Sequence, residues 1–575
     1  MTPADSRERL INEAASLLVS AFQDYNASFG DYTRRAKRRF EQRDRAGMRH
    51  DVSQRFALYD QSIEEAIARL EGRLAERLFS RPLWSAIRDR YGECIEQELD
   101  AELYKTFFNT IARRLFKTRG VDAVIEFVAL DIQPSDQITQ PVPRYTFMVA
   151  GSLVDTFSQI LDAYSFSLPY ASPSAQAHAL AERLQAAFGQ DQPVVCIELL
   201  ETVFYREGRA YLVGRALARD QHRPCVIALV CDAEAQAIRA DALLCERQQL
   251  SILFGFTFSY FMADLPTVAD AVLFLRSLLP DKPIDELYTV LGRIKQGKTE
   301  RYRAFFHHLS QHDGMTLAEA PGQRGLVMVV FTLPNYPLVF KVIRDHFAPS
   351  KQFGRAHVRE RYNVVFRHDR VGRLVDAQEF KDLRFPVGAL SEALLAELHS
   401  SCGKSLMMED DSLTIKHCYV ERRLRPLDLY LAEVEPSVAT AAALDYGQAL
   451  KDLARSNIFA GDLLPKNFGV TRSGRVIFYD YDELRLMSEC RFRRWPDAGD
   501  DLLDLSHEPW FHVGEADVFP EQFHQFMGLP PACLAALQAQ HAELFLPEWW
   551  QTVQAQLARG ETLDVPPYGS AARLS

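Results

Sequence analysis

The chain has 575 residues, a formal net charge of −11, and apolar and charged fractions of 47% and 25%. Because a single hydrophobic core rarely grows to this length, we expect two or three domains of ordinary globular type. The acidic balance argues against a general nucleic-acid-binding protein, which would present a basic face. Nine cysteines stand singly along the sequence without a C-x-x-C pair, and this pattern argues against a disulfide framework.

The N-terminus, MTPADSRERL, carries acidic residues and lacks the apolar segment of a signal peptide. The most apolar run, residues 250–265, contains Gly, Ser and Thr and is shorter than the roughly 20 residues that a membrane helix needs. We therefore expect this run to form a buried helix or strand. The sequence favours a cytoplasmic protein that has neither a membrane nor a nucleic acid as partner.

In the first part of the chain, hydrophobic residues recur every three or four positions, which predicts amphipathic helices over residues 9–25, 61–78 and 94–116. Strand-like runs follow at 121–130, 194–205, 210–218 and 225–231, with a hairpin turn at 206–208. Helical patterns return at 267–279 and 285–311. Residues 1–312 are thus predicted to form a mainly helical, mixed α/β domain, and no residue in it indicates chemistry.

The pattern changes near residue 317, where a glycine-containing loop precedes two predicted strands, 326–332 and 338–343. Gly322 and Gly325 would let backbone N–H groups approach phosphate oxygens closely. Lys341, on the second strand, could then pair with the α- and β-phosphates, as in protein kinases. Taken alone, the loop is explained equally well by a plain β-hairpin.

A further strand is predicted to begin at residue 413, followed by a polar break and the start of a helix. In a kinase-like fold this is the hinge, and backbone groups of Tyr419, Val420 and Glu421 would bind adenine there. A helical pattern over 441–462 then leads into the sequence FAGDLLPKNFGV.

Asp462 and Asn467, within FAGDLLPKNFGV, have the D-x-x-x-x-N spacing of a kinase catalytic loop. In such a loop the Asp takes or orients the substrate hydroxyl proton, and the Asn ligates Mg²⁺. Lys466 could contact the transferred phosphoryl group. The strand VIFYD then ends at Asp480, where kinases place a second metal ligand, and hard oxygen donors of this kind suit Mg²⁺ bound with ATP.

The order of these motifs predicts an α+β chain in which a bilobal protein-kinase-like domain follows the first domain. We expect this second domain to span residues 313–575. Its N-lobe would cover about 313–420 and its C-lobe about 421–575.

With these motifs the chain resembles the isocitrate dehydrogenase kinase/phosphatase family over essentially its whole length. The resemblance is most specific in APGQRGLVMVVFTLPNYPLVFKVIRD, RHDRVGRLVDAQEF, CYVERRLRPLDLYL and NIFAGDLLPKNFGV, followed by YDYDEL. It implies an N-terminal regulatory domain and a eukaryotic-kinase-like domain. It also implies a bifunctional enzyme that phosphorylates a serine of isocitrate dehydrogenase and removes that phosphate, directing carbon between the citric acid cycle and the glyoxylate bypass.

Carried over residue by residue, the resemblance makes Lys341 the nucleotide lysine and Asp376 an active-site aspartate. The implied ATP-binding loop consists of Ala320, Pro321, Gly322, Gln323, Arg324, Gly325 and Leu326. The implied cofactors are ATP, with ADP for the phosphatase direction, and Mg²⁺ or Mn²⁺. An AMP-type allosteric effector is implied near the junction of the two domains, and a homodimer is possible.

Three features depart from ordinary protein kinases. The catalytic loop reads A-G-D instead of H-R-D, and D-F-G is replaced by D-Y-D, which places Asp482 where a glycine is usual. The spacing between Lys341 and Asp462 leaves room for an insertion at about 345–385 that contains Asp376. We hypothesise that Asp376 and Asp482 activate water for phosphoserine hydrolysis, although an exposed turn would explain Asp482 equally well.

The glutamate expected to pair with Lys341 is Glu360, in RAHVRERYNVVF. A surface salt bridge of Glu360 with Arg355 or Arg359 is the alternative interpretation.

Two other functions fit part of the pattern. Small-molecule phosphotransferases of the aminoglycoside- and choline-kinase type share G-D-x-x-x-x-N, although the large first domain weakly favours a protein substrate. An ATP-binding pseudokinase is opposed by the retention of Lys341, Asp462, Asn467 and Asp480.

Overall fold

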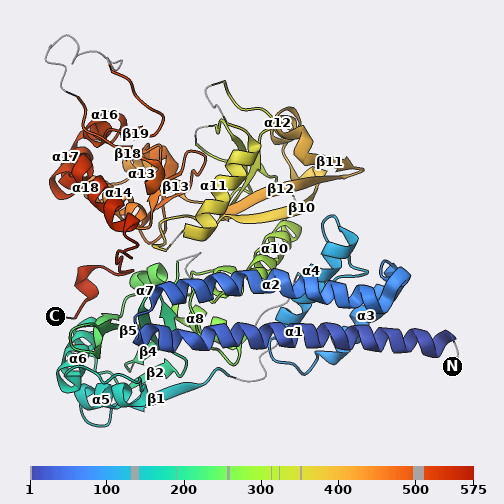
Figure 1. Cartoon of the computed structure of the whole chain (residues 1–575), viewed down its shortest axis with the longest axis horizontal. Helices are drawn as coiled ribbons and strands as arrows, with labels where there is room; N and C mark the ends of the chain where they lie inside the picture. The colour runs from blue at the N-terminus through green and yellow to red at the C-terminus, as the bar shows by residue number, and fades with distance from the viewer. Residues whose placement is uncertain are drawn as a thin grey trace. The chain divides into compact units, whose positions relative to one another are not determined.

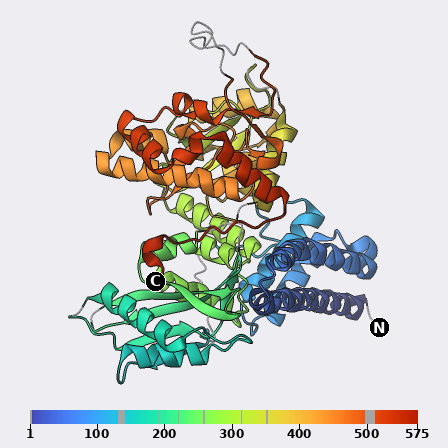
Figure 2. The same cartoon turned by 60° about the vertical axis from the view of Figure 1, so that its left-hand side comes forward.

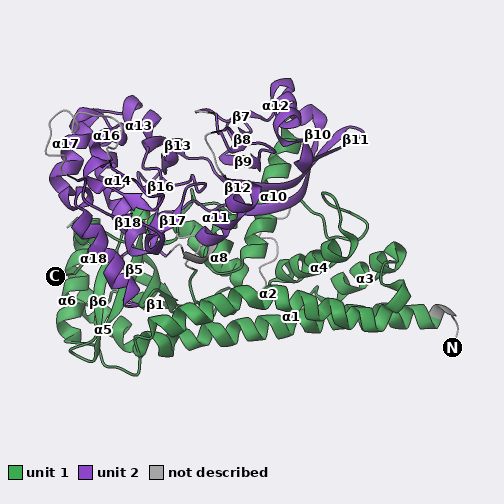
Figure 3. Ribbon diagram, turned by 45° about the horizontal axis from the view of Figure 1, so that its top comes forward, with its two compact units in different colours: residues 1–255, 259–313, 568–575 green, residues 256–258, 314–567 purple. Residues whose placement is uncertain are grey.

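The structure, a computed structural model, describes residues 3–130, 141–189, 191–219, 221–255, 260–312, 314–322, 324–349, 353–368, 370–496 and 511–574. The chain divides into two compact units (Figure 3): unit 1 comprises residues 1–255, 259–313 and 568–575, and unit 2 comprises 256–258 and 314–567. Unit 1 begins with long helices and continues into a sheet, and unit 2 has a sheet-rich lobe followed by a mainly helical lobe. The predicted fold class is therefore confirmed.

Unit 1 opens with four helices (Figures 1 and 2): α1 (Pro3–Glu41), α2 (Arg45–Leu74), α3 (Arg81–Cys94) and α4 (Ala101–Phe116). The turn between α1 and α2 is capped by Asp44, whose carboxylate accepts a hydrogen bond from the Gly47 amide at 2.7 Å. The helix predicted to start at Cys94 starts at Ala101 instead. Asp100 leaves the helical conformation (φ 56°), and its carboxylate accepts two backbone amide bonds at the start of α8 (Val268–Leu278).

An antiparallel sheet of six strands follows, in the order β1-β2-β4-β5-β6 with β3 paired to β4. The strands are β1 (Arg144–Met148), β2 (Cys196–Leu200), β3 (Phe204–Arg206), β4 (Arg209–Leu217), β5 (His222–Asp232) and β6 (Ala237–Leu244), with helices α5 (Leu153–Ala163) and α6 (Pro173–Phe188). The predicted hairpin turn joins β3 to β4, where Glu207 and Gly208 both have positive φ, as a tight hairpin turn requires. The predicted runs at 194–205, 210–218 and 225–231 coincide with β2 to β5, whereas β1 and β6 were not predicted.

The strand predicted at 121–130 is wrong, because these residues form turns and bends. Glu126 is buried there, and its carboxylate accepts hydrogen bonds from Arg113 of α4 at 2.7 Å and from Thr118 at 2.8 Å. Side-chain bonds, rather than a β-ladder, therefore hold this segment against α4.

The end of unit 1 is helical, with α7 (Arg247–Leu253), α8, α9 (Ile284–Val290) and α10 (Ile294–Gln311). The helix predicted over 285–311 is interrupted near Gly292, which has a left-handed backbone (φ 82°). Of the apolar run 250–265, residues 256–259 lie outside the described residues. No helix within the described ranges combines the length and the apolar composition needed to cross a membrane.

The last residues of the chain belong to unit 1, although the sequence placed them in the kinase-like domain. The Tyr568 hydroxyl donates to Asp241 Oδ2 at 2.7 Å and accepts a hydrogen bond from Arg209 Nε at 3.0 Å. The Leu574 amide donates to the Asp241 carbonyl at 2.9 Å, and Arg573 forms a bridge with Ala242 of β6. The tail thus adds a short extension to the edge of the sheet.

We expect Tyr568→Phe to lower the free energy of unfolding of unit 1 by about 1–3 kcal/mol, because the buried Asp241 carboxylate loses a hydrogen bond. Hydrogen exchange of the β6 amides under increasing urea would measure this change. Tyr145→Phe, on a half-exposed ring, is the control and should change stability by no more than about 0.5 kcal/mol. Equal protection of β6 in the Tyr568→Phe variant and the wild type would contradict the prediction.

The N-lobe of unit 2 is a six-stranded antiparallel sheet in the order β10-β12-β9-β8-β7, with β11 paired to β12. Its strands are β7 (Ala318–Glu319), β8 (Met328–Thr332), β9 (Leu338–Ile343), β10 (Gln378–Pro386), β11 (Leu406–Glu409) and β12 (Ser412–Arg422), and its helices are α11 (Arg355–His368) and α12 (Glu392–Cys402). β9 and β12 are neighbours, and their register pairs Lys341 with Tyr419. This pairing fixes which side chains of β12 can reach the lysine.

The C-lobe of unit 2 consists of helices, a three-stranded sheet in the order β13-β15-β16, and the strand pairs β14-β17 and β18-β19. Its helices are α13 (Leu427–Glu433), α14 (Pro436–Arg455), α16 (Phe523–Phe526), α17 (Pro531–Gln540) and α18 (Pro547–Ala558), and its strands are β13 (Arg425–Pro426), β14 (Ile458–Phe459), β15 (Phe468–Val470), β16 (Val476–Phe478), β17 (Arg485–Leu486), β18 (Arg491–Phe492) and β19 (Asp517–Val518). α14 buries Tyr446, Leu450 and Leu453 on one face, at the spacing that brings side chains to the same side of a helix. The loops that carry Asp462, Asn467 and Asp480 lie next to this helix.

Candidate active site

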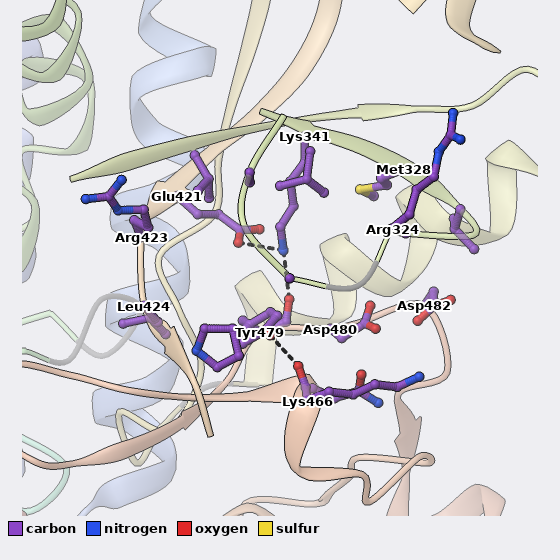
Figure 4. A pocket seen from close by; sticks show the side chains of 18 of the residues that line it. Arg324, Met328, Lys341, Glu421, Arg423, Leu424, Lys466, Tyr479, Asp480 and Asp482 are labelled. Carbon is purple, nitrogen blue, oxygen red and sulfur yellow. Dashed lines mark hydrogen bonds and ion pairs between the residues drawn. The ribbon is translucent and has the colours of Figure 1, made fainter. Parts of the chain in front are cut away.

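A cavity of about 790 Å³ lies within unit 2. Its lining comes from the glycine-containing loop, strands β8 and β9, the segment after β12, the catalytic loop and the segment after β16. The predicted functional side chains that line it are Lys341, Asp462, Lys466, Asn467, Asp480 and Asp482 (Figure 4). Folding therefore brings together groups that are far apart in the sequence.

The predicted ATP-binding loop forms one wall of the cavity, through Ala320, Pro321, Gly322, Arg324, Gly325 and Leu326; Gln323 lies outside the described residues. Gly322 has φ 123°, a conformation that favours glycine. A Cβ atom on Gly325 would lie 2.7 Å from the Met328 carbonyl oxygen. Arg324 binds Glu397 of α12, with Nε 3.2 Å from Oε1, and this pair anchors the loop.

Two oxygen atoms hold the ammonium group of Lys341 (Figure 4). Its Nζ lies 2.7 Å from Glu421 Oε2 and donates to the Tyr479 carbonyl at 2.9 Å. Because Lys341 pairs with Tyr419 across the ladder, Glu421, two residues farther along β12, projects from the same face. Burial raises the pKa of the Glu421 carboxyl, and the Lys341 ammonium opposes that shift. The ion pair is thus built within one sheet.

The prediction that Glu360 pairs with Lys341 is wrong. Glu360 is exposed on α11, and the lysine pairs with Glu421 instead. α11 contributes Tyr362, whose hydroxyl donates to Glu421 Oε1 at 3.4 Å and whose ring stacks on Tyr419 with centroids 3.9 Å apart. Residues two positions apart point to different faces of a helix, so Tyr362 faces the pair and Glu360 faces away.

Of the three residues predicted to bind adenine, only Glu421 lines the cavity. Tyr419 and Val420 lie inside β12 between β9 and β10, so the two ladders use their backbone groups, and neither residue lines the cavity. Glu421 lines it, but with a carboxylate that binds Lys341. The cavity is also bordered by Arg422, the last residue of β12, and by the residues that follow it, Arg423, Leu424, Arg425 and Pro426. Arg423 and Leu424 are seen beside the cavity in Figure 4.

The catalytic loop presents a carboxylate, an ammonium group and an amide to the cavity. Asp462 Oδ1 accepts the Leu464 amide proton at 3.0 Å, which fixes the carboxylate on the turn. Asn467 Nδ2 donates to the Asp462 carbonyl at 3.4 Å. Since this bond uses the nitrogen of the carboxamide, its oxygen is left to act as an acceptor or ligand. Lys466 lies between them in sequence and lines the same cavity.

The A-G-D sequence has a steric explanation. Gly461 has φ 77°, and a Cβ atom there would lie 2.2 Å from the Glu483 carbonyl oxygen. An arginine at this position would displace the segment that carries Asp480 and Asp482. The catalytic loop and the D-Y-D segment are therefore packed directly against each other.

Asp480 and Asp482 follow β16, and both line the cavity (Figure 4). The amide of Tyr479 donates to the Asn467 carbonyl at 3.1 Å, which ties this segment to the catalytic loop. Asp482 is only 9% exposed, so the interpretation of this residue as an exposed turn acid is wrong.

Asp376 is close to the site but does not line the cavity. It is 5% exposed, and its Oδ2 accepts a hydrogen bond from Gln378 Nε2 at 3.1 Å. Besides burial, the charge of Asp376 contributes to raising the pKa of Glu421, so the two carboxylates are near each other. Asp376 thus belongs to the layer behind the cavity wall.

The stretch at about 345–385, where an insertion is expected, forms part of the N-lobe. That stretch contains α11 and most of β10, which are regular parts of the N-lobe. The additional elements α12 and β11 come later, between β10 and β12.

Sequence reasoning missed the side chains of Glu421, Tyr362 and Gln378. For Glu421 a signal was available, because an acidic residue directly follows the apolar run CYV of the predicted strand. A charged residue inside a buried strand generally has a partner of opposite charge. Tyr362 and Gln378 gave no comparable signal.

Both halves of the chain match models of one family. Residues 15–313 match the isocitrate dehydrogenase kinase/phosphatase (AceK) regulatory domain, and residues 315–570 match the kinase domain of the same family. One solved structure, titled "ROP18 kinase domain in complex with AMP-PNP and sucrose", is 15% identical to this chain, with a TM-score of 0.18. The match covers 30% of this chain and 53% of that chain. This similarity is too low to bear on fold or function.

Proteins named isocitrate dehydrogenase kinase/phosphatase resemble this chain over nearly their full length. The protein of Xanthomonas axonopodis pv. citri (strain 306) is 53% identical over 576 residues, which is 100% of this chain and 99% of that protein. The protein of Xanthomonas campestris pv. campestris (strain 8004) is 54% identical over 97% of this chain and 96% of its own length. That of Anaeromyxobacter sp. (strain Fw109-5) is 40% identical over 97% of each. The chain therefore belongs to the isocitrate dehydrogenase kinase/phosphatase family.

Proposed function

We propose that this protein is a bifunctional enzyme that phosphorylates a serine of isocitrate dehydrogenase with ATP and removes the same phosphate. The observation that carries the proposal is the shared cavity: Lys341, Asp462, Asn467 and Asp480 line it together, in a chain whose two halves match this family. Through this pair of reactions the protein would direct carbon between the citric acid cycle and the glyoxylate bypass.

In the transfer reaction, the serine hydroxyl oxygen attacks the γ-phosphorus of ATP, and the bond to the β-phosphate oxygen breaks to release ADP. Asp462, on the catalytic loop, would take or orient the hydroxyl proton. Lys341, held by Glu421 and the Tyr479 carbonyl, would neutralise the α- and β-phosphates. Lys466 would stabilise charge on the transferred phosphoryl group.

The donors at the floor of the cavity fit a divalent cation. Asp480 offers a carboxylate oxygen and Asn467 a carboxamide oxygen, which are the hard ligands that Mg²⁺ or Mn²⁺ prefers. When bound with ATP, such an ion would stabilise the negative charge of the phosphates. Among the described residues, no group of three or more His, Cys, Asp or Glu side chains is arranged to hold a metal ion.

For the phosphatase reaction we propose that Asp482 activates water, which attacks the phosphoserine phosphorus and releases inorganic phosphate and the serine hydroxyl. Asp482 is the better placed of the two predicted carboxylates, because it lines the cavity whereas Asp376 lies behind its wall. Asp376 would then act from behind the wall, through its charge and through Gln378.

We expect Asp482→Ala to lower kcat for hydrolysis about 100-fold and kcat for transfer by less than about tenfold, because only hydrolysis needs a base for water. Release of phosphate from phosphorylated isocitrate dehydrogenase and its phosphorylation by ATP would be measured on the same preparation. Asp411→Asn, on an exposed acid between β11 and β12, is the control. Losses of the two activities in strict proportion would contradict a separate hydrolytic role.

The proposed function is tested by incubating the purified protein with isocitrate dehydrogenase, Mg²⁺ and γ-labelled ATP, and then removing ATP and adding ADP. We expect label on a serine of isocitrate dehydrogenase, followed by its release as inorganic phosphate. Labelling without release would leave a simple kinase. Labelling of aminoglycosides or choline instead would indicate a small-molecule phosphotransferase, and binding of ATP without any transfer would indicate a pseudokinase.

We also propose an AMP-type allosteric effector, a homodimer and a cytoplasmic location. These rest on the family resemblance and on the sequence. Activity assays with added AMP and sedimentation of the purified protein would test the first two.

A further inference from the structure

Residues 371–378 are buried throughout, although they lack regular secondary structure until β10 begins. A buried loop needs partners for its backbone polar groups. Here the Phe478 amide donates to the Arg373 carbonyl at 2.8 Å, and the Val375 amide donates to the Phe478 carbonyl at 3.1 Å. The loop thus runs beside β16, and Leu374 and Phe478 form a parallel bridge.

The side chain of Arg373 fixes these two chain segments to helix α14. Its guanidinium is 2% exposed and binds Asp445 through Nη1 at 2.7 Å and Nη2 at 2.9 Å, and Asp452 through Nε at 2.9 Å. The two aspartates are two helical turns apart and so lie on the same face of α14. The Val476 carbonyl accepts a bond from Nη1 at 2.9 Å, and the Val476 amide donates to Asp445 at 2.6 Å.

The parallel bridge relates the two catalytic carboxylates. Asp376 comes two residues after Leu374, and Asp480 comes two residues after Phe478. Because the two segments are parallel at the bridge, they leave it in the same direction. A side chain that binds both segments, as Arg373 does, therefore controls how Asp376 and Asp480 are placed relative to each other.

We propose that Arg373, which the sequence analysis did not single out, is a positioning residue for both transfer and hydrolysis. By binding Asp445, Asp452 and the Val476 carbonyl, it holds the two segments in register and sets the relative position of Asp376 and Asp480. The inference rests on the proposed function of the cavity. It concerns turnover rather than nucleotide affinity, since Lys341 and the hinge hold the nucleotide.

The test uses two variants of the full-length protein. In Arg373→Met/Asp445→Asn/Asp452→Asn the amides avoid leaving the buried Asp452 carboxylate and the partly buried Asp445 carboxylate without their cation. Arg373→Lys keeps the positive charge but loses the forked hydrogen-bond geometry of the guanidinium. If the triple variant binds no ADP, Arg373→Lys is used for the test instead. ADP titration counts the folded sites, and kcat for each reaction is expressed per ADP-binding site. We expect kcat to fall about 10- to 100-fold in the triple variant and less in Arg373→Lys, with the Kd for ADP changed by less than about threefold.

The matched control is Lys451→Met/Glu543→Gln, which removes another ion pair of α14 (2.8 Å) that does not touch the two segments. It should leave kcat per site unchanged. Wild-type kcat per site in the Arg373 variants, or a loss of ADP affinity equal to the loss of kcat, would overturn the positioning role. Asp480→Asn distinguishes a failure of the proposed active site from a failure of the Arg373 inference. If the Asp480→Asn enzyme still transfers phosphate, the proposed site is wrong. If it loses transfer while the Arg373 variants keep wild-type kcat, only the positioning role of Arg373 is wrong.

Discussion

Replacing Asp462 with asparagine should lower kcat for phosphoryl transfer by about 10²–10⁴-fold, while the Kd for ATP changes little. The carboxylate is fixed on its turn by the Leu464 amide, so the amide side chain should adopt the same geometry without being able to accept the substrate proton. Initial rates of phosphorylation of isocitrate dehydrogenase and equilibrium binding of ATP would measure the two quantities.

Asp411→Asn is the control for Asp462→Asn, because it makes the same chemical change on an exposed acid outside the cavity. It should retain wild-type rates. An Asp462→Asn enzyme that kept more than about a tenth of wild-type transfer would show that another group accepts the proton.

Lys341→Met should abolish transfer and also destabilise unit 2 by about 3–5 kcal/mol near neutral pH, because Glu421, at 1% exposure, would keep a buried charge without its partner. Burial raises the pKa of Glu421 in the folded state. The folded state therefore favours the protonated carboxyl, and the destabilisation should be small below about pH 4.5 and should grow as the pH rises. Urea denaturation of the full-length protein over a pH series would measure it.

The double variant Lys341→Met/Glu421→Gln separates the two roles of the lysine. It should recover most of the lost stability, since no buried charge remains, but it should not recover transfer. Glu360→Gln is the control, because that carboxylate is exposed on α11, and it should change stability by no more than about 0.5 kcal/mol. A double variant as unstable as Lys341→Met would show that the Lys341–Glu421 pair is not the source of the effect.

The parts of the site that could be predicted from the sequence are those set by short-range spacing. Asp462 and Asn467 lie on one loop, and Asp480 comes two residues after the end of β16, so short-range spacing places all three in one part of the fold. The glycines of the predicted nucleotide loop are likewise local, because Gly322 has a left-handed backbone and a Cβ atom on Gly325 would collide with the Met328 carbonyl.

The parts that could not be predicted depend on strand register and on strand length. Glu421 reaches Lys341 only because β12 pairs with β9 at Tyr419, and no sequence pattern states that pairing. The same strand extends to Arg422, so the residues expected to bind adenine lie inside the sheet. The buried segment around Arg373 has neither helical nor strand periodicity, so its partners became visible only in the fold.

The C-terminal tail has a consequence for how the two halves of the protein come apart. Apart from residues 256–258, which are also assigned to unit 2, the polypeptide passes from unit 1 to unit 2 near residue 313 and returns to unit 1 near residue 568. Proteolytic cleavage of the chain near residue 313 alone would therefore leave two fragments that still co-purify. The C-terminal fragment would remain attached because its last residues are hydrogen-bonded to Arg209 and Asp241. Separating the halves takes a second cleavage, before Tyr568.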